Sequence, residues 1–240
     1  SRICVVYHPS GRFQETMTLA KNPAVVLVDS QIIANAPVRY IIAGMGDALA
    51  TKFEAFQCAA SGAYTSFGAG GTHTAMCIAE ACYRSIRQFG ITARKDMKQH
   101  RVTHAVETII EACIYQSGIG FEGGGLSAAH GLTRGLSRVQ ELKQALHGEM
   151  VAFALLVQLV MEERNLNFML EIIDFYRRIG LPCSLSDLGL NIFSENHLMT
   201  IANHSCVSKS PIYNMDKTVT PARVRDAIDK LHNYYLTKGY

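Results

Sequence analysis

The chain has 240 residues, of which 48% are hydrophobic, so it is long and apolar enough to bury a substantial core. Its 23 Lys and Arg against 20 Asp and Glu leave a net charge of only +3, and no basic tract stands out, which argues against a nucleic-acid partner. The longest apolar run, residues 150–161, is too short to span a bilayer, and no segment resembles a signal peptide, so no membrane partner is expected.

The first 36 residues carry the strand signals of the sequence. Residues 3–7 and 24–28 are short runs rich in β-branched side chains, separated by a polar stretch, and we predict a strand at each. Two strands alone make a marginal sheet in water. We therefore expect this chain to be part of a longer protein.

From Pro37 onward the pattern becomes helical, with apolar residues at intervals of three and four. The predicted helices cover 37–60, 65–89, 94–117, 126–137, 147–163, 167–179, 194–206 and 221–236. Gly90, Gly118 and Gly180 are expected to end helices, and Thr220 is expected to cap a helix that begins with proline. The fold class is therefore mainly α, with residues 1–36 separate from a helical domain at 37–240.

Seven cysteines form no C-x-x-C pair, and an odd number fits poorly with a closed set of disulfides. They lie mostly in apolar helical stretches, as reduced thiols do. The cysteine pattern predicts a cytoplasmic protein.

Three polar side chains stand in unusual surroundings. Asp47 follows two glycines inside an apolar helical run, His130 follows small residues after a glycine-rich turn, and His147 begins the most apolar helix. The two histidines are 17 positions apart, so they can meet only where two helices meet. One carboxylate and two imidazoles suit zinc and, less selectively, ferrous iron, and three ligands leave a position open for substrate. On pattern alone, an Asp at a cap or surface and a His in a core remain the commoner alternatives.

Two other histidine pairs are weaker metal candidates. His100 and His104 have the spacing of ligands on one helix, but no glutamate follows His100 as in H-E-x-x-H, and a solvated helix face is the better interpretation. His197 and His204 have no acidic residue between them and are interpreted as surface or packing residues.

Three segments in register carry a family resemblance. RYIIAGMGDALATKFEA at 39–55, YQSGIGFEGGGLSAAHGL at 115–132 and LHGEMVAFALL at 146–156 resemble the glycerol dehydrogenases, within the iron-containing alcohol dehydrogenase and dehydroquinate-synthase-like superfamily. The resemblance covers the whole chain. It implies the helical C-terminal domain of that fold, with one or two β-strands left from an α/β cofactor domain.

The resemblance also implies an active site. Asp47, His130 and His147 match the ligands of a catalytic metal, Zn²⁺ or Fe²⁺, and Phe121 matches an aromatic residue of the substrate pocket. The implied reaction is oxidation of glycerol, or a related 1,2-diol, to dihydroxyacetone, with hydride transfer to NAD in a cleft between two domains. Members of the family form homo-oligomers, so self-association is expected.

Most of the expected cofactor domain cannot be found. Glycines at 68–73 and 121–125 do not follow a strand, so neither segment has the context of a dinucleotide-binding turn. Ser1 and Ile3 fall where the resemblance places cofactor contacts. We expect the chain by itself to be inactive with NAD.

One departure lies a turn beyond His130, where the family usually has H-x-x-H-N-G and this chain has Thr133, Arg134 and Gly135. The change leaves two alternatives open within the superfamily, a dehydroquinate-synthase-like lyase and a dehydrogenase of a phosphorylated polyol, both of which need basic residues such as Arg134. A third alternative is a helical oligomerisation or binding module without catalysis.

Overall fold

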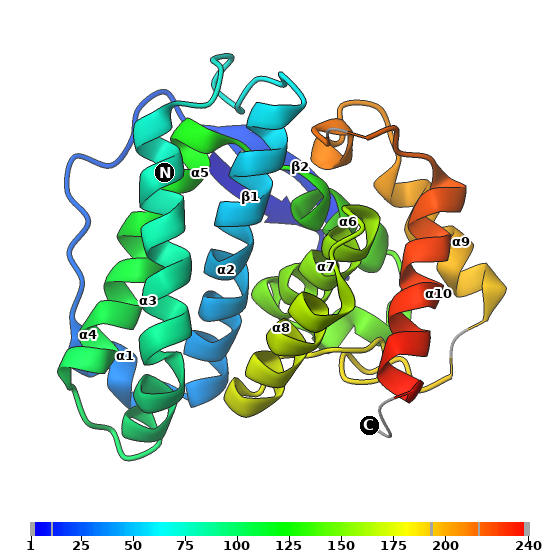
Figure 1. Cartoon of the computed structure of the whole chain (residues 1–240). Coiled ribbons are helices and arrows are strands. Elements are labelled where there is room, and N and C mark those ends of the chain that lie inside the picture. The colour runs from blue at the N-terminus through cyan, green and yellow to red at the C-terminus, as the bar shows by residue number, and fades with distance from the viewer. Residues whose placement is uncertain (1–2, 11, 193, 216, 238–240) are drawn as a thin grey trace.

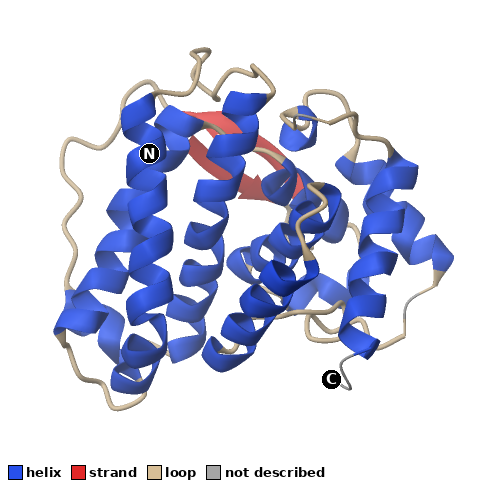
Figure 2. Cartoon of the chain, in the orientation of Figure 1, coloured by secondary structure: helices blue, strands red, loops and turns tan. Residues whose placement is uncertain are grey.

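The computed structural model describes residues 3–10, 12–192, 194–215 and 217–237. Helices make up most of it, and a small sheet lies across one end of them (Figures 1 and 2). The mainly α prediction is confirmed. The α-helices are α1 Ser30–Asn35, α2 Val38–Ala60, α3 His73–Met97, α4 His104–Glu111, α5 Ser117–Gly124, α6 Ala128–Leu136, α7 His147–Met161, α8 Leu166–Ile179, α9 Glu195–Ser205 and α10 Pro221–Thr237.

The sheet is an antiparallel hairpin of β1, Ile3–Tyr7, and β2, Phe13–Thr18. The predicted strand at 3–7 is confirmed, but the one at 24–28 is wrong. Those residues form an extended, largely exposed segment, with Leu27 92% exposed. A strand needs a neighbour for its backbone N–H and C=O groups, and no described strand pairs with this segment.

The predicted helices at 37–60, 126–137, 147–163, 167–179, 194–206 and 221–236 match observed ones within about two residues at each end. Gly180 caps α8 in the left-handed conformation, with φ of 92°. The Thr220 hydroxyl accepts a hydrogen bond from the Arg223 amide at 3.2 Å, as expected of a helix cap.

The predicted helices at 65–89 and 94–117 are wrong at their ends, and the first of them begins only at His73, because residues 65–72 form a loop. α3 continues through Gly90. A Cβ at this position would lie 3.2 Å from Met45 and 3.3 Å from Phe175, so the glycine allows close packing and does not end the helix. The predicted helix at 94–117 is two helices, because a turn precedes α4. The chain then continues through a π-helical turn, Ala112–Gln116, into α5, which contains Gly118. α1 was not predicted, although Asp29 caps it by accepting the amide hydrogens of Gln31 and Ile32.

α7 is the central helix of the core. It packs against α2, α6, α8 and α10, and nearly every residue from Gly148 to Met161 is buried. This explains why its sequence is apolar on all sides. Among the described residues, no helix combines the length and the apolar character that crossing a membrane requires.

α2 and α7 approach each other unusually closely. A Cβ on Gly148 would lie 2.0 Å from the carbonyl oxygen of Ala43, and a Cβ on Gly46 would lie 2.7 Å from the carbonyl oxygen of Gly148. Both positions therefore require glycine. The crossing brings residue 47 of α2 beside the first residue of α7.

The division of the chain between residues 36 and 37 stays a prediction. α1 ends at Asn35 and α2 begins at Val38, so the proposed boundary falls in the short connection between them.

We expect Gly148→Ala to destabilise the protein by about 1–3 kcal/mol, because its methyl group would force α2 and α7 apart. Urea denaturation measures the change. Gly44→Ala is the matched control on α2, since its Cβ would make only an ordinary contact, 3.6 Å from Cys113 Sγ, and it should leave stability unchanged or raised. Equal stability of Gly148→Ala and the parent would contradict this account of the crossing.

Candidate metal centre

Asp47, His130 and His147 come together from α2, α6 and α7. Asp47 Oδ1 lies 3.2 Å from His130 Nε2 and 4.0 Å from His147 Nε2. One ligand atom from each residue lies within 4.8 Å of the other two, and the imidazole centroids are 5.5 Å apart. The spacing of an oxygen and two nitrogens around one point matches what a divalent ion requires.

The start of α7, and with it His147, is fixed by an ion pair. Glu149 accepts a hydrogen bond from the Leu146 amide at 2.8 Å and pairs with Arg39 of α2 through two bonds of 2.6 and 2.7 Å. The Arg39 guanidinium also donates to the carbonyl of Gln144 at 3.0 Å. These bonds attach the first turn of α7 to α2, the helix that carries Asp47.

Glu54, which is fully buried beside His130, was not identified from the sequence. Its Oε2 lies 2.6 Å from His130 Nδ1, and its Oε1 accepts the amide hydrogens of Ser127 and His130 at 3.0 and 2.9 Å. Nδ1 therefore faces Glu54 while Nε2 faces Asp47. A carboxylate on the far nitrogen is the usual outer partner of a metal-binding histidine. The available signal was an acid seven residues, two helix turns, after Asp47 on the same face.

Burial and neighbouring charges set the three pKa values of the site. Burial works against ionisation of Asp47, but the hydrogen bond and positive charge of His130 outweigh it and lower the Asp47 pKa. For His130, burial opposes protonation, yet the charge of Glu54 and the bonds to both acids raise the pKa to about 10. Burial dominates at His147 and lowers its pKa. The metal-free site thus holds an ionised Asp47, a protonated His130 and a neutral His147.

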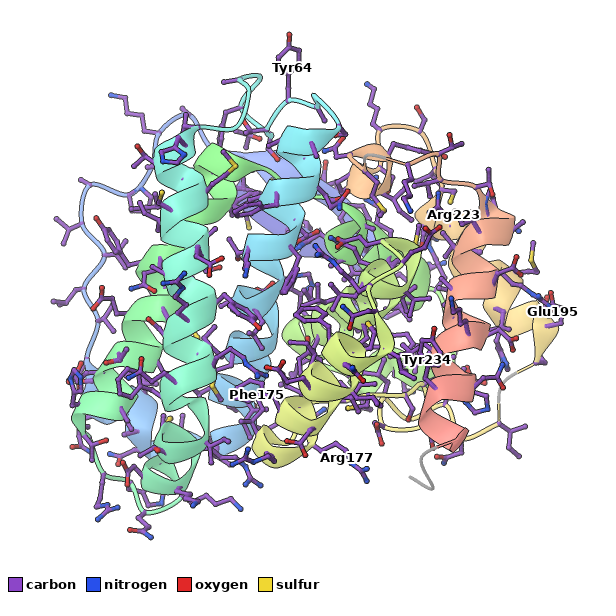
Figure 3. The ribbon with its side chains drawn as sticks, in the orientation of Figure 1. Tyr64, Phe175, Arg177, Glu195, Arg223 and Tyr234 are labelled. Atoms are coloured by element: carbon purple, nitrogen blue, oxygen red, sulfur yellow. The ribbon has the colours of Figure 1, made fainter. Side chains whose placement is uncertain are left out.

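The three side chains open into a cleft of about 860 Å³. Ile3 of β1 and Phe121 of α5 line it, as does Tyr64, which extends from the loop between α2 and α3 (Figure 3). The expected pocket residue Phe121 and the expected cofactor contact Ile3 are thus both at the cleft, while their roles stay predictions. Ser1 lies outside the described residues.

The described residues fit a metal ion, but none of them forms the strand-to-helix turn that typically binds the phosphates of a dinucleotide. β1 leads into β2 and not into a helix, so no strand-to-helix turn is present in this part of the chain. The glycines at 68–73 and 121–125 instead pack together, with the Thr72 amide donating to the Gly123 carbonyl at 2.9 Å.

The other histidine pairs are placed elsewhere. His100 does not share a helix with His104, because it lies in the turn before α4 with φ of 55°, and its Nδ1 is 3.1 Å from the Ala34 carbonyl oxygen. His197 lies in the first turn of α9, 3.8 Å from Glu141, and His204 is exposed. Among the residues that the structure describes, the cluster of Asp47, His130 and His147 alone has metal-ligand spacing.

Comparison with known proteins gives consistent matches, although no family model matches the chain. Glycerol dehydrogenase from Thermotoga maritima is 38% identical over 98% of this chain and 64% of its own length. The crystal structure of a probable glycerol dehydrogenase from Sinorhizobium meliloti has a TM-score of 0.95 and 37% identity, and the match covers 99% of this chain and 67% of that one.

A more distant match concerns the fold alone. The iron-containing alcohol dehydrogenase from Thermotoga maritima has a TM-score of 0.71 at 17% identity, over 96% of this chain and 59% of that chain.

This chain spans about two thirds of the length of the glycerol dehydrogenases that it matches, 64% in the case of the one from Thermotoga maritima. The near-complete coverage of this chain at 37–38% identity shows that it belongs to the glycerol dehydrogenase family.

Proposed function

We propose that this chain forms the metal-binding and substrate-binding part of an NAD-dependent glycerol dehydrogenase. The observation that carries the proposal is the convergence of Asp47, His130 and His147 at the base of a cleft. Zinc is the favoured ion because one carboxylate and two imidazoles form a common zinc ligand set, and Fe²⁺ is the alternative.

The roles of the residues follow from their positions. A bound divalent ion would polarise a substrate hydroxyl and lower its pKa. Glu54 holds the Nδ1 proton of His130, so that Nε2 is kept available as a ligand. Phe121 supplies an apolar wall that orients the substrate and excludes water from part of the cleft.

The substrate and the hydride acceptor are inferred from family membership. The relatives from Thermotoga maritima and Citrobacter freundii are glycerol dehydrogenases, which supports oxidation of glycerol to dihydroxyacetone with hydride transfer to NAD. Ile3 remains a candidate cofactor contact at the cleft, and Ser1 remains one by sequence. A cytoplasmic location and a homo-oligomer also remain predictions.

The alternatives from the sequence are less well supported. A module without catalysis has no use for a buried carboxylate that orients a histidine toward a second carboxylate, as Glu54 does with His130 and Asp47. The names of the relatives point to glycerol rather than to a phosphorylated polyol or a lyase.

His147→Ala tests the metal site with the least collateral change, because removing His130 would leave the buried Glu54 without its imidazole. We expect zinc affinity to fall more than the roughly 10- to 100-fold seen when an outer partner is lost, since a direct ligand is removed. Zinc content after dialysis and calorimetric binding of glycerol to the zinc-loaded protein are the measurements. His204→Ala, which changes an exposed histidine, is the control. Undiminished zinc and glycerol binding in His147→Ala would overturn the proposed function.

The raised pKa of His130 predicts how metal binding depends on pH. In the metal-free protein His130 carries a proton up to a pKa of about 10, while the lowered pKa values of Asp47 and His147 leave those groups ready to bind. Metal must displace that one proton. Apparent zinc affinity should therefore rise about tenfold per pH unit between about pH 7 and 9.

Glu54→Gln is expected to flatten this slope, because it removes the charge that raises the His130 pKa while its amide oxygen can still accept the backbone hydrogen bonds. Competition with a chromophoric chelator at several pH values measures the slopes. The same slope in parent and variant would show that Glu54 does not control the His130 proton.

A further inference from the structure

Among the described residues that line the cleft there is one arginine, Arg134, and it is half-buried. Arg134 follows His130 by one turn of α6, and its guanidinium stacks on the ring of Phe13 in β2, with Cζ 5.1 Å from the ring centroid. Stacking on an aromatic face fixes the plane of the guanidinium and leaves the N–H groups at its edge available. The side chain is thus held in one position without using its donors.

No carboxylate among the described residues pairs with Arg134, and its guanidinium makes no hydrogen bond within the described chain. Partial burial lowers its pKa, since the charge is removed from water without a compensating anion. The neighbouring Thr133 hydroxyl is already committed, because it donates to the His130 carbonyl at 2.7 Å. A partly desolvated cation beside a ligand site, with no anionic partner in the described part of the chain, is typical of a group that binds an anion.

The charges around the cleft also favour an anionic ligand. Asp47 is the only acidic residue among the described residues that line it, whereas Arg134 and the exposed Lys209 are both basic. Binding of a divalent ion by Asp47 would leave the lining with a net positive charge. A cleft of one sign concentrates ligands of the opposite sign.

The spacing limits the size of the ligand. Residues four apart on a helix have Cβ atoms about 6 Å apart on one face, so Arg134 and His130 extend into the cleft as neighbours. This spacing suits a short compound, which would place a hydroxyl at the metal centre and its other end toward Arg134. Larger compounds are not needed to join the two positions.

We propose that Arg134 binds the carboxylate of an acidic substrate, so that the cleft accepts glycerol but prefers a short vicinal diol that carries a carboxylate, with glycerate as the simplest case. The inference rests on the proposed function, since it takes the same cleft and the same metal centre. One guanidinium matches one carboxylate in charge and in its two-pronged geometry. A phosphate dianion would need a second cation, and the other basic residue among the described lining residues, Lys209, is exposed to solvent, where an ion pair contributes little.

The test is calorimetric binding of D-glycerate, glycerol and glycerol 3-phosphate to the zinc-loaded protein. We expect glycerate to bind about 10- to 100-fold more tightly than glycerol, and Arg134→Gln to remove that preference while the zinc content stays unchanged. Arg134→Lys keeps the charge without the planar fork and should keep part of the preference. Arg138→Gln makes the same change at an exposed position outside the cleft lining and should have no effect.

Each other result has a distinct meaning. Equal affinity for glycerate and glycerol, or a preference that survives Arg134→Gln, would overturn this inference and leave the proposed function standing. Arg134-dependent binding of glycerol 3-phosphate without binding of glycerate would also overturn it, in favour of a phosphate ligand. Failure of the parent to retain either zinc or Fe²⁺ would instead overturn the proposed function.

Discussion

The close crossing of α2 and α7 is the constraint on which the site depends. Gly46 and Gly148 let the two backbones approach to a distance that no side chain would allow, and the Arg39–Glu149 pair attaches the first turn of α7 beside α2. Asp47 and His147 are direct consequences, because each is adjacent in sequence to one of these glycines. Metal ligands on rigid, closely packed helices are held more precisely than ligands on loops.

A buried carboxylate completes this arrangement. Glu54 is excluded from water, a position that is costly for a charge unless it is fully paired, and its pairing is with two backbone amides and His130. The imidazole therefore connects two acids, Glu54 in the core and Asp47 at the cleft. Arg134, one turn beyond His130 on α6 and stacked on Phe13, adds a cationic group to the cleft beside its metal-binding residues.

Sequence patterns predicted the helices well where apolar spacing alone decides them, and these include α2, α6 and α7, which carry the site. They failed where a glycine serves packing, as at Gly90, and where a strand needs a partner from elsewhere, as at 24–28. Residue types and context identified Asp47, His130 and His147, and the resemblance gave them roles. Glu54 was missed because its role depends on a contact with His130, which is 76 positions away in the sequence. Spacing along one helix does not reveal such a contact.

X-ray absorption at the zinc edge of the zinc-loaded protein tests the central claim most directly. The account predicts a first shell of nitrogen and oxygen only, at about 2.0–2.2 Å, with two imidazoles resolved by their outer-shell scattering. A sulfur neighbour near 2.3 Å would contradict it. That result would indicate a thiolate ligand, such as that of Cys113 at the cleft, in place of the carboxylate and imidazole set.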